Sequence, residues 1–102
     1  MIRHIVFFSC KPGHSPQEIV RGLSVLTGIE HARKVEIALN EKVDQIGNDV
    51  DIVVYAEFDS VEALRAFKAH PLYDDSTRNV RPLRELRFAA DFDVAKATTT
   101  LL

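Results

Sequence analysis

Two segments of the chain are apolar on both alternating faces of a predicted strand, and this feature most restricts the fold. In residues 2–10, IRHIVFFSC, both sets of alternate positions are largely apolar. Residues 51–59, DIVVYAEFD, repeat the pattern near their middle. β-Branched and aromatic residues favour strands, and apolar side chains on both faces indicate a strand that is covered on both sides. Both segments are therefore expected to be strands with apolar side chains on both faces.

The clearest helix start is the segment SPQE. Ser15 can cap the helix, Pro16 suits its first position, and Glu18 stands where a capping box requires it. Apolar residues then recur at helical spacing up to Gly28, a residue type that often ends helices. We expect a helix over residues 16–27.

The remaining elements follow from changes in the hydrophobic period. Alternation predicts strands over residues 33–43 and 85–94. A second helix, capped at 59–60, ends near His70 because Pro71 cannot continue it. We expect an irregular stretch between this proline and the last strand.

The order β-α-β-β-α-β is that of the ferredoxin-like α+β fold, with a four-stranded antiparallel sheet. In this order the two strands with apolar side chains on both faces, within residues 2–10 and 51–59, would be the central ones. We assign residues 1–95 to this domain and residues 96–102 to a C-terminal tail. Two helices can cover only one face of such a sheet, so the other face would expose an apolar patch, which monomers seldom do. We therefore expect a homodimer that stacks two bare sheet faces into an α+β barrel.

Composition excludes several classes of partner. The 102 residues include 13 basic and 15 acidic side chains, so no overall positive field attracts nucleic acid. The longest apolar runs, residues 5–8 and 52–56, are much shorter than the roughly 20 residues of a membrane-spanning helix. The start of the chain lacks a signal-peptide pattern, and Cys10 is the only cysteine, which fits a reducing compartment. We expect a cytoplasmic protein without a membrane partner.

The sequence predicts neither a metal site nor a cofactor. It has no metal-ligand spacing on a single element, no glycine-rich phosphate loop and no serine or cysteine nucleophile motif. The segment RNVRPLRELR contains arginines at intervals of three: Arg78, Arg81, Arg84 and Arg87. We interpret them as a solvated rim interleaved with Asp75 and Glu85, and an anion-binding patch is the alternative.

Four short motifs resemble the stress-responsive A/B barrel (Dabb) family, a branch of the dimeric α+β barrel proteins. They are IRHIVFF at the start, FKAHPLY after the second helix, the V-x-P of residues 80–82 and the closing ADFD. The resemblance runs from about residue 1 to residue 93, and it implies a ferredoxin-like protomer and a homodimer. Some members of the family are stress-induced proteins without a known activity, and some plant members are polyketide cyclases.

The resemblance to the plant cyclases also suggests site residues. His4 matches a strand-one histidine that helps to define the cyclase pocket, and His70 with Pro71 matches a His-Pro pair. Tyr73 stands where the cyclases have their histidine base, and Phe67 stands where they have a pocket tyrosine. A phenol is a poor base at neutral pH, so the plant mechanism does not carry over directly.

The candidate catalytic residues are His4, His70 and Tyr73, and each also has a structural interpretation. His4 would point toward the helices and need a polar partner there, either backbone near His70 or a group in a pocket. His70 can end the second helix by bonding its last carbonyl groups. Tyr73 can cover the core with its ring.

Two functions follow from these residues. The first is a homodimeric binding or stress-associated domain without an assured reaction, and the second is a cyclase-like enzyme that acts on a small aromatic or polyketide-like molecule. Either would use a pocket between sheet and helices for a small apolar or aromatic ligand. Apart from the three candidate catalytic residues, its expected walls are Val6, Phe8, Ile19, Leu23 and Phe67.

Overall fold

The computed structural model describes residues 1–101, so the last residue of the expected tail lies outside the described part. The elements, in chain order, are β1 (Ile2–Cys10), α1 (Pro16–Leu23), the 3-10 helix η1 (Ser24–Gly28), β2 (Lys34–Leu39), β3 (Ile52–Phe58), α2 (Val61–Ala69), α3 (Pro71–Val80), β4 (Arg84–Asp93) and the 3-10 helix η2 (Val94–Lys96).

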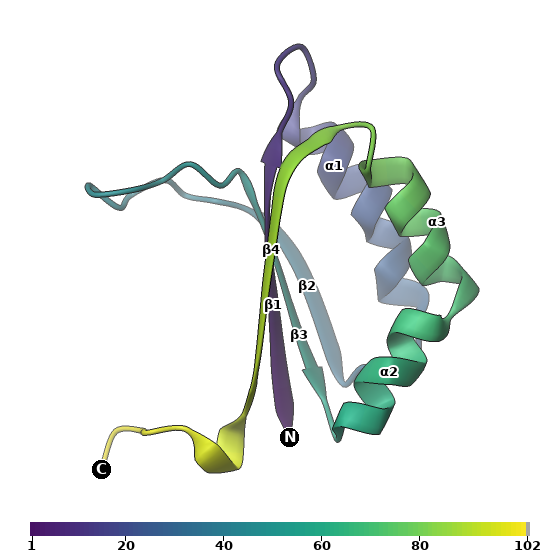
Figure 1. Ribbon diagram of the computed structural model, residues 1–102, viewed down its shortest axis with the longest axis vertical. Helices are drawn as coiled ribbons and strands as arrows, with labels where there is room; N and C mark the ends of the chain where they lie inside the picture. The colour runs from purple at the N-terminus through teal and green to yellow at the C-terminus, as the bar shows by residue number, and fades with distance from the viewer. Residues whose placement is uncertain (102) are drawn as a thin grey trace.

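The strands form one antiparallel sheet in the order β2-β3-β1-β4. β1 and β3 are the central strands, as the ferredoxin-like order predicts, and the ferredoxin-like fold is confirmed. α1, α2 and α3 lie on one side of the sheet (Figure 1). The connection between β2 and β3 and the C-terminal segment project toward the other side. No helix within residues 1–101 is long and apolar enough to cross a membrane.

The stretch after Pro71 was expected to be irregular, and that prediction was wrong. It forms α3, and Pro71 occupies the first turn of this helix. A proline ends the preceding helix, but its fixed φ angle and missing N–H also suit the start of the next one. Asp74 and Asp75, which belong to this stretch, therefore lie on a helix.

The boundaries of two other elements differ from the predicted ones. The first helix begins as expected, with the Ser15–Glu18 capping box, but it tightens into η1 after Leu23. β2 ends at Leu39, four residues earlier than predicted, and a loop connects it to its antiparallel neighbour β3. Alternation alone did not show where pairing stops, because apolar residues continue into the loop.

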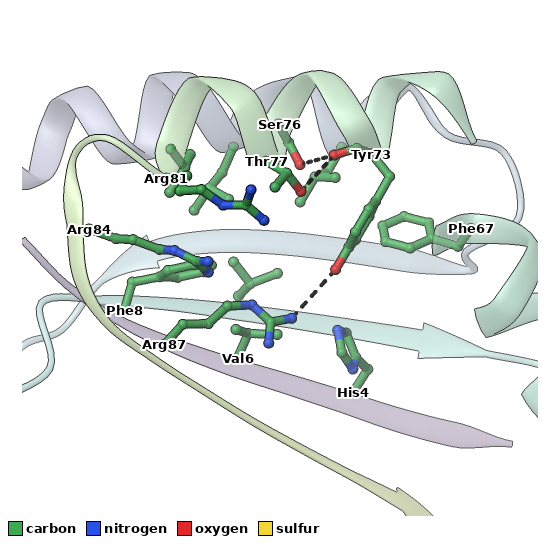
Figure 2. A pocket seen from close by; sticks show the side chains of 14 residues that line it. His4, Val6, Phe8, Phe67, Tyr73, Ser76, Thr77, Arg81, Arg84 and Arg87 are labelled. Atoms are coloured by element: carbon green, nitrogen blue, oxygen red, sulfur yellow. Dashed lines mark hydrogen bonds between the residues drawn. The ribbon is translucent and has the colours of Figure 1, made fainter. Parts of the chain in front are cut away.

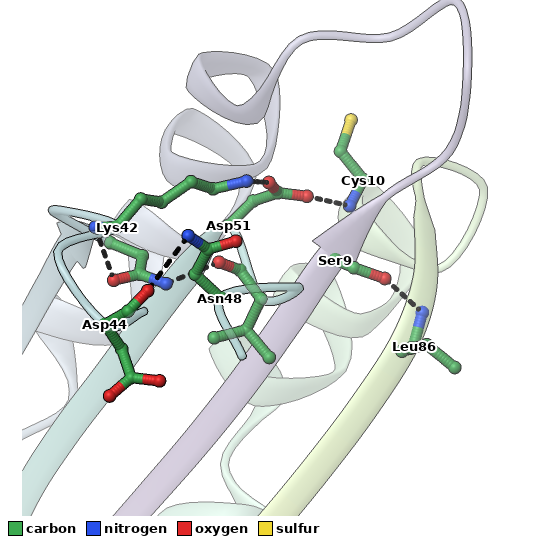
Figure 3. A network of polar contacts seen from close by, with 9 residues as sticks. Ser9, Cys10, Lys42, Asp44, Asn48, Asp51 and Leu86 are labelled. Atoms are coloured by element: carbon green, nitrogen blue, oxygen red, sulfur yellow. Dashed lines mark hydrogen bonds and ion pairs between the residues drawn. The ribbon is translucent and has the colours of Figure 1, made fainter. Parts of the chain in front are cut away.

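A polar network ties this loop to the end of β1 (Figure 3). Asp51 accepts a hydrogen bond from the backbone N–H of Cys10 at 2.8 Å and pairs with Nζ of Lys42 at 2.7 Å. Although burial opposes the effect, these contacts lower the pKa of Asp51. On the other side of β1, the Ser9 hydroxyl accepts a hydrogen bond from the N–H of Leu86 at 3.0 Å.

The hydrophobic core lies between the sheet and the helices. Alternate residues of the central strands point into it, and they are Ile2, Val6 and Phe8 of β1 with Ile52, Val54, Ala56 and Phe58 of β3. Ile19 of α1 and Phe67 of α2 face them and are almost fully buried. Burying a side chain of this size stabilises the fold by about 1.5–3 kcal/mol.

The opposite face of the sheet has no helix over it. Its apolar residues lie side by side in the strand register, and they are Ile5, Phe7, Val53, Phe88, Ala90 and Phe92. Phe88 is 57% exposed and Phe92 is 38% exposed. The apolar set of β4 therefore faces away from the helices, and the chain itself leaves it uncovered.

Candidate functional site

His4 is a polar residue among the apolar residues that β1 directs at the helices. Only 2% of its surface is exposed. Its partner is Asp91 on β4, which lies directly across from it in the strand register, and Nδ1 of His4 is 2.5 Å from Oδ1 of Asp91. The sequence predicted a partner near His70 or in a pocket, and the observed partner is a carboxylate on the neighbouring strand.

The contact with Asp91 sets the proton arrangement of the imidazole. A carboxylate only accepts hydrogen bonds, so Nδ1 carries the hydrogen and Nε2 of neutral His4 is left as an acceptor. Burial lowers the pKa of His4. The bond and charge of Asp91 oppose this shift, and the positive charges of Lys68 and Arg87 add to it. The site therefore favours a neutral imidazole that can accept a proton.

A cavity lies beside His4, between the sheet and the helices (Figure 2). The empty volume is about 450 Å³ when the open mouth is included. The enclosed volume in which the centre of a water molecule fits is about 40 Å³. Its lining residues from the sheet are His4, Val6, Phe8, Val54, Arg84 and Arg87. Those from the helical layer and the following turn are Leu23, Leu26, Phe67, Tyr73, Ser76, Thr77, Val80 and Arg81.

A series of aromatic side chains runs from His4 to Tyr73. His4 packs edge-on against Phe58, with ring centres 6.2 Å apart. Phe58 packs against Phe67 at 5.0 Å, and Phe67 packs against Tyr73 at 5.8 Å. Tyr73 therefore covers the core with its ring, while its hydroxyl group points into the cavity toward Arg87 (Figure 2).

Three arginines meet at the same cavity. Arg81 is the C-cap residue of α3, and Arg84 and Arg87 lie on β4. Residues three apart on a regular strand point to opposite faces. Here the register shifts between Phe8 and Cys10, so that two residues of β4 stand opposite Ser9 and both arginines reach the cavity.

The cavity brings together most of the residues predicted from the sequence. His4, Val6, Phe8, Leu23, Phe67 and Tyr73 all line it. Two predicted residues, Ile19 and His70, do not line the cavity. Ile19 is fully enclosed in the core on the neighbouring turn of α1.

His70 lies at the junction of two helices. It is the C-cap residue of α2 and the N-cap residue of α3. Its Nδ1 accepts a hydrogen bond from the N–H of Leu72 at 3.0 Å. The sequence predicted a bond to carbonyl groups at the end of α2, and this was wrong because Pro71 starts a second helix whose free N–H groups need an acceptor.

The sequence interpretation missed Asp91 and did not show that three of the arginines meet at one cavity. Arg78 pairs with Asp75 on the surface of α3, as expected for a solvated rim of arginines and acidic residues. The other three arginines instead line the cavity. Their spacing of three gave a signal, but the register shift that brings both Arg84 and Arg87 to the cavity side depends on how β4 pairs with β1.

No group of three or more histidine, cysteine, aspartate or glutamate side chains in the described part of the chain is arranged to hold a metal ion.

The fold resembles several solved proteins. A protein from Thermobifida fusca, described as a dimeric ferredoxin-like protein of unknown function, is 23% identical with a TM-score of 0.77, over 91% of this chain and 90% of that chain. A protein from Arabidopsis thaliana is 20% identical with a TM-score of 0.78, over 100% of both chains. The hydroxynitrile lyase from Passiflora edulis is 15% identical with a TM-score of 0.76, over 96% of both chains. At these identities the likeness shows the fold alone.

No curated protein matches the sequence. Residues 2–94 match the family described as the stress responsive A/B barrel domain, and this range includes all four strands and the three α-helices. The match confirms the resemblance that the short motifs suggested. The chain belongs to the stress-responsive A/B barrel domain family.

Proposed function

We propose that this protein binds a small, largely apolar molecule in the cavity beside His4. The observation that carries the proposal is the lining of this cavity, which combines apolar walls with one buried imidazole that keeps a free acceptor at Nε2. Binding sites for small molecules are typically apolar with a few well-placed polar groups. The volume of the cavity that water can occupy is small. A ligand must therefore be small itself, or it must displace the long side chains at the mouth of the cavity.

Titration with small phenols tests the proposal. We expect p-cresol and 4-ethylphenol to cause saturable NMR shifts at the amides of Val6, Leu23 and Val54, which line the cavity. Thr77→Phe adds a ring at the cavity wall and should abolish the shifts. His14→Ala, a change in an exposed loop, is the control and should leave them unchanged. Absence of saturable shifts in the unaltered protein would overturn the proposal.

The same proposal includes a homodimer formed through the helix-free face of the sheet. Its support is the row of apolar side chains on that face, since monomers seldom expose such a patch. The dimeric description of the protein from Thermobifida fusca is a second support. Because this face lies on the other side of the sheet from the cavity, the dimer leaves the ligand site open to the helical side.

A second candidate function is general acid–base catalysis on a small aromatic ketone or polyketide-like substrate. The short contact between His4 and Asp91 favours it, because a neutral imidazole held by a carboxylate is a suitable base. Incorporation of deuterium from D₂O into the methyl group of acetophenone would test for this base. We expect His4→Gln to abolish the catalysed exchange and His14→Ala to retain it. Equal exchange in both variants would rule His4 out.

A further inference from the structure

Arg81, Arg84 and Arg87 form a cluster of positive charge at one end of the cavity, which we call the arginine cluster. Their side chains come from the end of α3 and from β4, and they extend into the same space (Figure 2). Arg84 is partly buried, while Arg81 and Arg87 are exposed. In this view Arg81 and Arg84 lie away from Phe67 and His4, and the guanidinium group of Arg87 lies between Arg84 and His4.

The arginine cluster has no acidic partner among residues 1–101. Arg33 and Arg78, in contrast, are each paired with an aspartate, Asp59 and Asp75. Burial lowers the pKa of Arg84, and the nearby charges of Arg87 and Arg81 lower it further. Bringing three like charges together beside an apolar cavity costs free energy that a bound anion would recover.

The hydrogen bonds around the cluster leave donors available to such an anion. Nη2 of Arg87 donates to the hydroxyl oxygen of Tyr73 at 3.4 Å, so the hydroxyl hydrogen of Tyr73 stays free to donate. The hydroxyl groups of Ser76 and Thr77 both donate to the carbonyl oxygen of Tyr73 instead. The free donors are therefore guanidinium groups and one phenol.

These donors fit a carboxylate better than a phosphate. A planar guanidinium pairs with either anion through two parallel hydrogen bonds, so the other donors of the site decide between them. Phosphate sites commonly add backbone N–H groups from the start of a helix. Here the cluster lies at the C-terminal end of α3, because Arg81 is its C-cap residue. That end does not present the free N–H groups of a helix start, so the backbone donors that phosphate sites commonly use are missing here.

We propose that the ligand of this cavity is a small carboxylic acid, whose carboxylate binds the arginine cluster and whose apolar body extends along Val6 and Leu23 toward His4. This assignment rests on the proposed binding function and adds the chemical class of the ligand. The arginine cluster then acts as the charged end of an otherwise apolar site. Tyr73 donates a hydrogen bond to the same carboxylate.

Three ligands with the same aromatic body test the assignment: phenylacetate, phenylacetamide and benzylphosphonate. We expect phenylacetate to bind at least tenfold more tightly than the neutral amide, and more tightly than the phosphonate, when the titrations are followed by NMR. Arg84→Gln and Arg87→Gln should each weaken phenylacetate about tenfold or more, since a charge-assisted hydrogen bond is lost. Arg78→Gln, which removes an arginine outside the cavity, is the matched control and should change nothing.

The outcomes separate this assignment from the proposed function. If phenylacetamide or p-cresol binds as tightly as phenylacetate, and Thr77→Phe still abolishes binding, the apolar site stands and the carboxylate assignment is overturned. Tighter binding of benzylphosphonate than of phenylacetate also overturns it. If none of the compounds binds, both proposals fail. Equal weakening by Arg78→Gln and Arg84→Gln would show a nonspecific charge effect and likewise overturn the assignment.

Discussion

His4 of β1 and Asp91 of β4 are cross-strand neighbours whose Nδ1 and Oδ1 atoms lie 2.5 Å apart on the helix-covered face of the sheet. The imidazole is almost completely buried, whereas 38% of the Asp91 side chain is exposed. The carboxylate therefore holds a buried base while it remains in contact with solvent itself.

The first prediction concerns pH. Burial lowers the pKa of His4 in the folded protein, whereas an exposed imidazole has a pKa of about 6.5. Between the lowered value and about 6.5, the unfolded chain binds a proton that the folded chain does not. The contribution of His4 to the free energy of unfolding therefore decreases as the pH falls below about 6.5.

Urea unfolding at a series of pH values from about 5 to about 7 measures this effect. His4→Asn keeps an N–H donor near Asp91 but cannot titrate, so the loss of stability on acidification should be smaller in this variant. His14→Ala, which removes an exposed histidine, is the control. The same pH dependence in His4→Asn and the unaltered protein would contradict the assignment to His4.

The second prediction concerns assembly. Phe88→Asp places a charge among the apolar side chains of the helix-free face, so we expect this variant to be a monomer in light scattering at micromolar concentration. Val61→Asp is the matched control, because Val61 is an exposed apolar residue at the first turn of α2, on the helical side. A monomeric unaltered protein would contradict the proposed dimer, and so would a dimeric Phe88→Asp variant.

The third prediction separates a structural role of His70 from a catalytic one. His70→Ala removes the acceptor for the N–H of Leu72 and should lower the free energy of unfolding by about 1 kcal/mol. His70→Asn should restore most of this loss, because asparagine is a good N-cap residue. Both variants should bind p-cresol like the unaltered protein. Loss of binding in the folded His70→Asn variant would instead assign His70 to the ligand site.

The fourth prediction concerns the contact between α1 and α3. A Cβ atom built on Gly22 would lie 3.0 Å from Cγ2 of Val80 and 3.2 Å from Cβ of Asn79. Gly22→Leu should therefore push the helices apart and lower the free energy of unfolding by about 1–3 kcal/mol in chemical denaturation. Gly47→Leu is the control, since nothing lies within 4 Å of its added Cβ. Equal stability of the two variants would refute the close contact.

The fold could be predicted because its signals are local. The capping box at Ser15 and the alternation of the strands act over a few residues, and the structure confirms the helix start and the sheet. Pro71 showed the limit of local reasoning, because the same residue that ends one helix begins another. Whether the chain continues as a helix depends on whether the apolar side of α3 packs against the core. A local sequence pattern does not contain this information.

The candidate site was predictable only in part, for a similar reason. His4 and Leu23 stand out because their positions in a strand and a helix already place them on the core side. Asp91 and the arginine cluster depend on strand register, and one shifted pair at Ser9 decides where Arg84 points. Hydrophobic periodicity depends on neighbouring residues only, so it does not reveal pairing between residues more than seventy positions apart.

β4 is an edge strand, and its consecutive residues Arg87 and Phe88 serve opposite faces of the sheet. Because adjoining residues share one backbone, an event that fixes either of them restricts the other. If the proposed ligand fixes Arg87 and the proposed partner chain fixes Phe88, the two binding events are thermodynamically linked through this strand. If ligand strengthens the association of chains by some factor, association strengthens ligand binding by the same factor.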